Sequence, residues 1–136
     1  MNTIYDKILV FSKREHGEVK LTPNFKVREF ACQDGTDVVL IHPAIPQICQ
    51  AVRDNFGKAF SPNSAYRTVS HNSAVGGSKY SLHIYGKAVD IPAIGCTPNE
   101  LYAFCEEWCG NTCEIGLYSW GVHVGIQFEK ERFKGN

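Results

Sequence analysis

The segment from Ser81 to Asp90 constrains the fold more than any other part of the sequence. It reads Ser81-Leu-His83-Ile-Tyr-Gly86-Lys-Ala88-Val-Asp90, which has the form SxHxxGxAxD. Gly86 allows a turn that brings the chain back toward His83. Asp90 alternates with apolar neighbours, so its side chain can face away from the core while theirs face into it. The pattern predicts a turn followed by a strand, with an imidazole and a carboxylate brought together.

Residues 122–128 predict a second strand with one further histidine on its polar face. One face carries Val122, Val124, Ile126 and Phe128, and the other carries His123, Gly125 and Gln127. Zinc binds imidazole nitrogen and carboxylate oxygen, and a catalytic zinc ion uses three protein ligands. His83, Asp90 and His123 are therefore candidate ligands of one zinc ion per chain, although this set would also take other divalent ions.

Two amphipathic helices are expected, over residues 43–56 and 97–109. In the first, apolar residues recur at helical spacing, Pro43 suits the first turn and Gly57 the C-terminal stop. In the second, Thr97 and Glu100 form a capping box. Short strands are expected at residues 64–67, 87–92 and 114–118. The predicted fold class is α+β, a small and mainly antiparallel sheet with helices packed on one side.

Length and composition indicate one domain, residues 1–136, in which residues 1–20 form an N-terminal extension with a short strand. The chain has 136 residues, 43% of them hydrophobic, and 14 basic residues balance 14 acidic ones. A nucleic-acid partner would favour a basic excess, so none is expected. No stretch approaches the length of a membrane span and no signal peptide is recognisable. We expect a monomer.

The six cysteines are Cys32, Cys49, Cys96, Cys105, Cys109 and Cys113. Without a signal peptide, free thiols are favoured over disulfides. Cys105, Cys109 and Cys113 lie four apart and lack a CxxC motif, so buried apolar side chains on a helix are favoured over a metal site.

Three segments together resemble the D-Ala-D-Ala carboxypeptidases and phage endolysins, a group of zinc peptidases that act on the bacterial cell wall. The segments are Ser64-Ala-Tyr66-Arg67-Thr68, the SxHxxGxAxD motif and Trp120-Gly-Val-His123-Val. The group shares its zinc site with D-Ala-D-Ala dipeptidases, lysostaphin-type enzymes and the hedgehog domain. The resemblance covers roughly residues 20–128. It implies that His83, Asp90 and His123 are the zinc ligands.

The same resemblance implies further roles. Arg67 matches an arginine that holds substrate and stabilises the oxyanion, a role suited to a guanidinium; a structural salt bridge is the alternative. Ser81, with Tyr66, is expected at the substrate-binding edge, although Ser81 also suits a turn before His83. The implied reaction is hydrolysis of an amide bond in a peptidoglycan stem peptide or cross-link, by a carboxypeptidase or an endolysin-type endopeptidase.

The general base is the point at which the sequence departs from this group. Relatives often carry an acidic residue or histidine shortly before the last ligand, where this chain has Trp120 and Gly121, or read His-Val-Asp, where it has His123-Val124-Gly125. Glu114 and His71 are the candidate bases. A non-catalytic zinc domain that binds wall peptides or another partner is the alternative function, and a binding domain without metal is a third.

Peptidoglycan stem peptides are the expected partners, with no nucleic acid and no membrane. A chain made in the cytoplasm without an export signal would need another agent to reach the wall. A phage lysis system is one such route, so a phage-encoded lysin is favoured.

Overall fold

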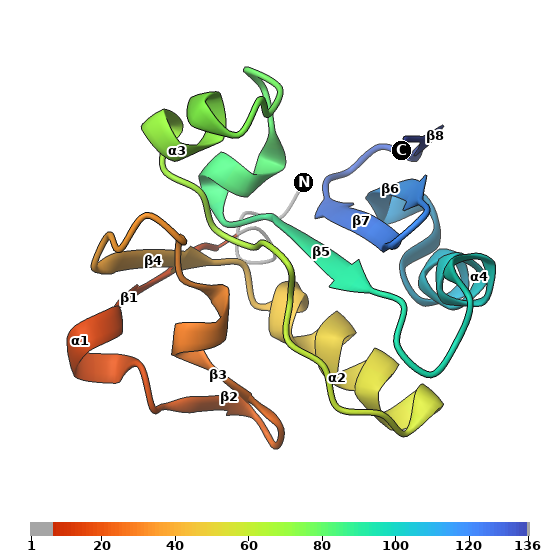
Figure 1. Ribbon diagram of the computed structural model, residues 1–136, viewed down its shortest axis with the longest axis horizontal. Coiled ribbons are helices and arrows are strands. Elements are labelled where there is room, and N and C mark those ends of the chain that lie inside the picture. The colour runs from red at the N-terminus through yellow and green to blue at the C-terminus, as the bar shows by residue number, and fades with distance from the viewer. Residues whose placement is uncertain (1–6, 136) are drawn as a thin grey trace.

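The computed structural model describes residues 7–135 and shows three small sheets and their helices around one hydrophobic core (Figure 1). A four-stranded sheet has the order β5-β7-β6-β8, and two two-stranded sheets pair β1 with β4 and β2 with β3. The mixed helix and strand content agrees with the predicted class. The antiparallel character is not complete, because β6 and β8 run parallel.

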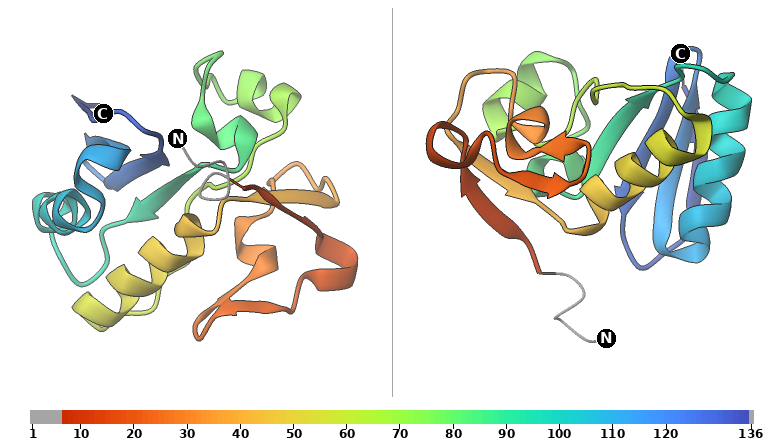
Figure 2. Two further views of the ribbon diagram at one scale, coloured as in Figure 1. Left: turned by 180° about the vertical axis from the view of Figure 1, so that it is seen from behind. Right: turned by 90° about the horizontal axis from the view of Figure 1, so that it is seen from below.

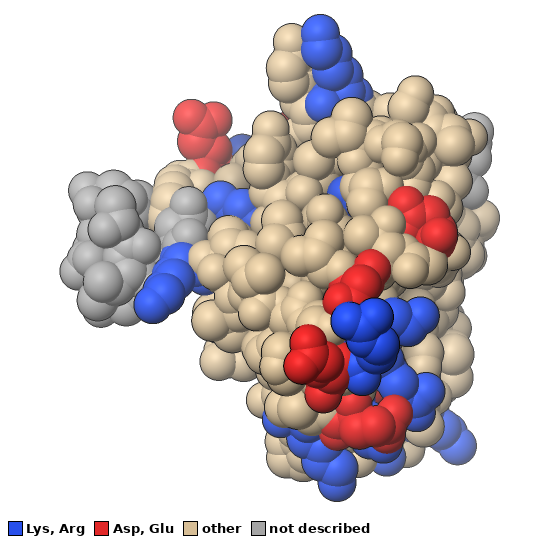
Figure 3. All heavy atoms as spheres, turned by 90° about the vertical axis from the view of Figure 1, so that its left-hand side faces the viewer, with Lys and Arg blue, Asp and Glu red and all other residues tan. Residues whose placement is uncertain are grey.

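The N-terminal part of the chain forms the two smaller sheets. Strand β1 (Leu9–Ser12) pairs antiparallel with β4 (Val38–Ile41), and β2 (Lys20–Thr22) pairs with β3 (Phe25–Lys26). Between and after them lie α1 (Lys13–His16) and the 3₁₀ helix η2 (Val27–Phe30). A short strand within residues 1–20 was expected and is present; residues 1–6 lie outside the described part. Basic and acidic side chains intermingle over this region of the surface (Figure 3).

Both predicted helices are present. Helix α2 (Ala44–Phe56) ends at Gly57, whose φ of 67° is a left-handed conformation that glycine adopts without strain. Helix α4 (Pro98–Cys109) begins after Thr97, and the reciprocal hydrogen bonds between Thr97 and Glu100 complete the expected capping box. The two helices contact each other, and their apolar faces enter the common core.

The four-stranded sheet is formed by the C-terminal part of the chain. Its strands are β5 (Ala88–Pro92), β6 (Cys113–Tyr118), β7 (Gly121–Ile126) and β8 (Glu131–Lys134). Helix α4 packs on β6 and β7, with the short 3₁₀ helix η4 (Gly110–Thr112) between α4 and β6 (Figure 2). Val122 and Val124 are fully buried on the core side, so the residues between them face the other side of the sheet.

Two elements differ from the sequence-based expectation. Residues 64–67 form no strand; Ser64 makes only an isolated bridge to Asp90 at the outer edge of β5. Strand β7 ends at Ile126, and Phe128 is 48% exposed instead of continuing the buried face. The remaining helices do not join α2 and α4: α3 (Val69–Ala74) and the 3₁₀ helix η3 (Leu82–Tyr85) flank β5 on the side away from α4 (Figure 1).

The expectation that all the cysteines are free is wrong for one pair. Cys109 and Cys113 form a disulfide, which ties the last residue of α4 to the first residue of β6. Spacing alone did not reveal it, because a helix would hold residues four apart as stacked neighbours, whereas here η4 turns the chain between them. Cys32, Cys49, Cys96 and Cys105 are free thiols. Cys105 is buried on α4 as predicted, whereas Cys113 is buried on a strand and not on the helix.

Among the described residues, none of the helices combines the length and apolar character that crossing a membrane requires.

Candidate metal centre

The pairing of β5 with β7 brings two of the predicted ligands together. Asp90 and His123 are directly opposite each other in this antiparallel ladder, on the face away from α4. His123 Nδ1 lies 3.0 Å from Asp90 Oδ1. The strand register therefore fixes this pair, because cross-strand neighbours have the shortest side-chain separations in a sheet.

His83 joins them from the 3₁₀ helix η3, which Ser81 caps by accepting a hydrogen bond from the backbone N–H of His83. Gly86 ends η3 with φ 71°, and a side chain there would collide with the backbone of Leu40 in β4. The turn expected from the motif is therefore present, and a close approach to a neighbouring strand reinforces the need for glycine. His83 Nε2 lies 3.1 Å from Asp90 Oδ1.

The hydrogen bonds of the two imidazoles select the nitrogens that face the centre. His83 Nδ1 lies 2.6 Å from the carbonyl oxygen of Ala65, which can only accept, so Nδ1 carries the proton and Nε2 presents its lone pair. His123 Nε2 lies 2.7 Å from Glu114 Oε1, so in neutral His123 the free lone pair is on Nδ1. Such outer contacts orient metal-binding histidines and fix their tautomers.

The donor set fits a zinc ion. One ligand atom from each of His83, Asp90 and His123 lies within 4.8 Å of the other two. Zinc–nitrogen and zinc–oxygen bonds of about 2.0–2.1 Å in tetrahedral geometry correspond to ligand–ligand separations of about 3.3 Å, close to the 3.0 and 3.1 Å found here. Three ligands would leave the fourth tetrahedral position open, as in catalytic sites.

Electrostatics also favour a cation at this centre. Burial alone would raise the pKa of Asp90, but hydrogen bonds from His123 and His83 hold it well below its usual range. Burial alone would lower the pKa of His123, yet hydrogen bonds to Asp90 and Glu114 raise it to about 9 in the metal-free protein. In the metal-free protein, protonated His123 therefore balances the charge of the carboxylates of Asp90 and Glu114. A bound metal ion would replace this proton and supply the positive charge itself.

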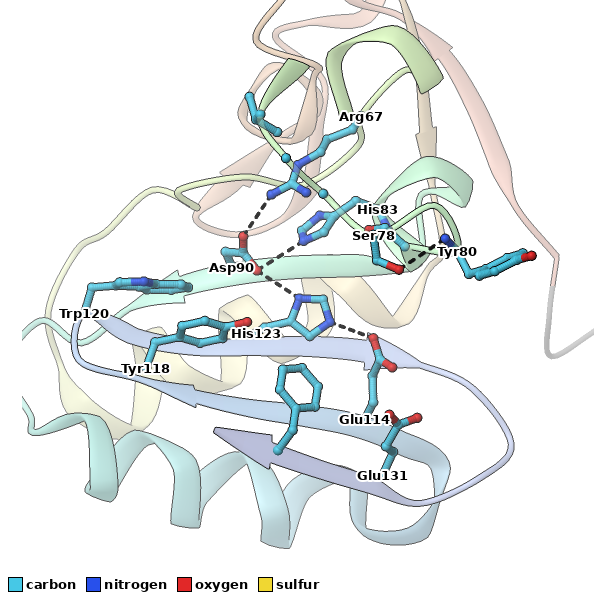
Figure 4. A pocket seen from close by; sticks show the side chains of 15 residues that line it. Arg67, Ser78, Tyr80, His83, Asp90, Glu114, Tyr118, Trp120, His123 and Glu131 are labelled. Carbon is cyan, nitrogen blue, oxygen red and sulfur yellow. Dashed lines mark hydrogen bonds and ion pairs between the residues drawn. The ribbon is translucent and has the colours of Figure 1, made fainter. Parts of the chain in front are cut away.

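Arg67 points into the same centre (Figure 4). Its guanidinium donates to Ser64 Oγ at 3.0 Å and to Asn72 Oδ1 at 3.2 Å, and lies 3.4 Å from Asp90 Oδ2. Asn72 is buried and also donates to the carbonyl of Ser78, so one amide fastens both Arg67 and the loop before the motif. Asn72 was not among the residues predicted from the sequence, and its position shortly after Arg67 is the only signal that the sequence offers for it.

A cavity of about 500 Å³ opens over the ligands. Arg67, Ser81 and Glu114 line it, so three of the predicted site residues lie with the ligands. Tyr66 does not belong to this group, because it is buried in the hydrophobic core. His71 lines a separate, smaller hollow beside Arg67 and Trp120.

Three aromatic side chains that were not predicted from the sequence form one wall of the cavity. Tyr118 and Trp120 stack at a centroid distance of 4.8 Å, and Phe133 from β8 lies beside Tyr118 and His123. Burial, followed by the negative charges of Asp90 and Glu114, raises the pKa of Tyr118. The phenol therefore keeps its proton and can donate a hydrogen bond into the cavity.

Glu114 occupies the space above Gly125. The two residues are paired across β6 and β7, and a Cβ atom at position 125 would lie 2.7 Å from both Cγ and Oε1 of Glu114. The carboxylate that reaches His123 thus comes from the neighbouring strand, and glycine at position 125 makes room for it. Although position 125 carries no acidic side chain, Glu114 still places a carboxylate next to the centre.

Comparison with known proteins assigns the chain to a family. The sequence profile of the family described as Peptidase M15 matches residues 20–126, which include His83, Asp90 and His123. No curated protein and no solved structure matches the chain. The match covers most of the sequence, and the family consists of zinc-dependent peptidases that act on peptidoglycan-related substrates. The chain therefore belongs to the peptidase M15 family of metallopeptidases.

Proposed function

We propose that this protein hydrolyses amide bonds in the stem peptides or cross-links of bacterial peptidoglycan, as a carboxypeptidase or an endolysin-type endopeptidase. The observation that carries the proposal is the convergence of His83, Asp90 and His123 with Arg67 in one open cavity. A likeness to the hedgehog and D-Ala-D-Ala peptidase fold, action as a monomer on the cell wall and a phage origin belong to the same proposal.

His83, Asp90 and His123 would hold the zinc ion. When bound, zinc polarises a scissile carbonyl and lowers the pKa of a water molecule toward about 7. Arg67 faces the cavity with a rigid guanidinium, and we assign it to balance the negative charge that develops on the carbonyl oxygen. Its bonds to Ser64, Asn72 and Asp90 hold it in place before substrate arrives.

We assign Glu114 to position His123. Its Oε1 atom accepts from Nε2, on the opposite side of the imidazole ring from the ligating Nδ1. A proton acceptor must come within about 2.6–3.2 Å of the reacting water, which would lie near the ligating atoms. The observed contact suits a carboxylate that orients and polarises a ligand, a recurrent arrangement around zinc-bound histidines.

The experiment that tests the function is digestion of purified peptidoglycan by zinc-loaded protein, with the released fragments identified by mass spectrometry. New fragments that are absent with His83→Ala would establish peptidase activity, and their masses would identify the bond. His16→Ala is the matched control, because His16 is exposed, belongs to α1 and does not line the cavity over the ligands.

A second candidate function is binding of wall peptides without cleavage. The engagement of Glu114 with His123 favours it, because the carboxylate nearest the centre already has a partner. Binding of fragments with one zinc ion per chain and no cleavage, under conditions where His83→Ala binds no zinc, would select this function over hydrolysis.

A further inference from the structure

A second group of metal-binding side chains lies outside the centre described above. Cys32 Sγ, a carboxylate oxygen of Asp34 and a ring nitrogen of His71 all lie within 4.8 Å of one another. Cys32 and Asp34 belong to the loop between η2 and β4, whereas His71 belongs to α3. We propose that these three residues form a second metal site, which binds zinc or a related divalent transition-metal ion.

Thr68 organises this group before any metal binds. Its hydroxyl donates to Asp34 Oδ2 at 2.8 Å, and its backbone N–H donates to Cys32 Sγ at 3.5 Å. Thr68 also caps α3 by accepting from the backbone N–H of His71. Thr68 therefore fixes the position of the loop that carries Cys32 and Asp34 relative to the helix that carries His71.

Capping of α3 by Thr68 does not explain why the imidazole ring of His71 lies beside Cys32 and Asp34. Thr68, Asp34 and Thr36 satisfy one another, since Asp34 Oδ1 also accepts from the Thr36 backbone N–H at 2.9 Å. Within residues 7–135, neither ring nitrogen of His71 has a hydrogen-bond partner, although the ring lies beside a thiol and a carboxylate. A metal ion would use all three groups at once.

The donor types indicate the class of metal. A thiolate with an imidazole and a carboxylate suits zinc and related transition ions, whereas magnesium and calcium prefer oxygen ligands alone. Cys32 is almost fully buried, so its thiol is shielded from solvent reagents, which argues against a nucleophilic role with His71. The partly exposed His71 and exposed Asp34 give an ion access from the surface.

The second site would adjoin the first through Arg67. His71 lines the hollow of about 280 Å³ that also includes Arg67, Asp90 and Trp120. Arg67 immediately precedes Thr68, and Asn72, which holds the guanidinium, immediately follows His71. A metal on His71 would thus tie down the segment that carries Arg67.

Cobalt(II) titration of the metal-free protein separates the two sites by their spectra. His83, Asp90 and His123 contain no sulfur, so thiolate-to-cobalt charge-transfer absorption in the near ultraviolet reports only on a cysteine ligand. We expect two equivalents of cobalt to bind, one of them with this absorption. This measurement is independent of peptidase activity, so its outcome and that of the digestion experiment can be told apart.

Matched variants make the assignment specific. Cys32→Ser is expected to abolish the charge-transfer band and one equivalent of cobalt, and His71→Ala, at a half-buried position, to do the same without disturbing the core. His83→Ala should keep the band and lose the other equivalent, and Cys96→Ser should leave both intact. Binding of a single equivalent without the band, or a band that survives both Cys32→Ser and His71→Ala, would overturn the proposal.

Discussion

The two groups of metal-binding side chains share an imidazole and a carboxylate but are built in different ways. In the centre formed by His83, Asp90 and His123, the main-chain register of β5 and β7 places two of the three ligands opposite each other. The group formed by Cys32, Asp34 and His71 depends on the side chain and amide of Thr68 to hold a loop against a short helix.

The two groups differ in how firmly the structure holds their ligand geometry. Backbone ladders and core burial over-determine the first centre, in which His83 is 2% exposed and Asp90 is 8% exposed. The second group can relax by rotation of a few side chains, so we expect it to bind metal more weakly. Sites on strands of a scaffold hold their geometry better than sites on loops.

Removal of a ligand from the rigid centre should have the largest effect. Metal catalysis contributes several kcal/mol of transition-state stabilisation, so His83→Ala should lower the rate of hydrolysis by on the order of 10³-fold or more. Initial rates on peptidoglycan, together with zinc content, measure this loss. The Cys32→Ser variant should retain most of the rate; equal losses in the two variants would remove the distinction between the centres.

Substitution of Arg67 should have the next largest effect on the rate, because its guanidinium acts on charge that develops during the reaction. Loss of one such donor costs about 10²–10³ in kcat. We expect this loss in Arg67→Ala and only partial recovery in Arg67→Lys, since a lysine cannot reproduce the three contacts to Ser64, Asn72 and Asp90. Zinc affinity should change far less than kcat. A matching fall in zinc affinity would instead make Arg67 a structural partner of Asp90.

Substitution of Glu114 should have a smaller effect on the rate, and this effect should arise from weaker zinc binding. Loss of an outer partner of a metal-binding histidine typically costs about 10–100-fold in affinity or activity. We expect that loss in Glu114→Ala, whereas Glu114→Gln, whose amide oxygen can still accept from His123 Nε2, should retain most of the zinc affinity and the rate. Competition with a chelator measures the affinity. A Glu114→Gln variant that binds zinc normally but does not cleave would identify Glu114 as the proton acceptor.

Gly125 tests the same contact from the other strand. A methyl group at this position would meet the carboxylate of Glu114, so Gly125→Ala should displace Oε1 from His123 and lower zinc affinity by less than Glu114→Ala does. In the Glu114→Ala background the same substitution should cost less zinc affinity, because only the contact with Leu82 Cδ1, also 2.7 Å from that Cβ position, remains. Additive losses in the double variant would mean that Gly125 acts independently of Glu114.

In the metal-free protein, the free energy of unfolding should depend on pH through His123 in the rigid centre. The pKa of His123 is raised to about 9 in the folded protein, above about 6.5 in the unfolded chain. Its contribution to the free energy of unfolding is therefore complete below about pH 6.5 and is lost as the pH rises through about 9. Urea unfolding of metal-free protein at both ends of this window should show the decrease, and His123→Asn should remove it.

Periodicity and caps predicted the parts of the fold that depend on neighbouring residues. Helices α2 and α4 and strand β7 followed from local spacing, and the motif that includes His83 and Asp90 indicated a metal centre. The parallel pairing of β8 with β6 and the disulfide between Cys109 and Cys113 were not predicted, since both depend on how distant or turned segments meet. The placement of Glu114 over Gly125 likewise depends on register between strands, which the sequence of either strand alone does not specify.

The group formed by Cys32, Asp34 and His71 could not be predicted from the sequence either. The position of His71 near the motif in the sequence makes it a candidate base, but in the structure its ring on α3 lies beside Cys32 and Asp34. Cys32 and His71 are far apart in the chain, and no spacing rule joins them. Tyr66 shows the opposite case: it lies next to Arg67 in the sequence, yet its side chain packs in the hydrophobic core together with Ala65.

The order of the strands has a consequence for how the protein is made. Strand β7 lies between β5 and β6 although it follows both in the chain, so these two earlier strands have no partner in the sheet until β7 is inserted. The last ligand, His123, arrives on that same strand. During synthesis, a ribosome-bound chain that has not yet released residue 123 can neither close the sheet nor complete the ligand set. Metal capture and closure of the sheet are therefore expected to be one late event.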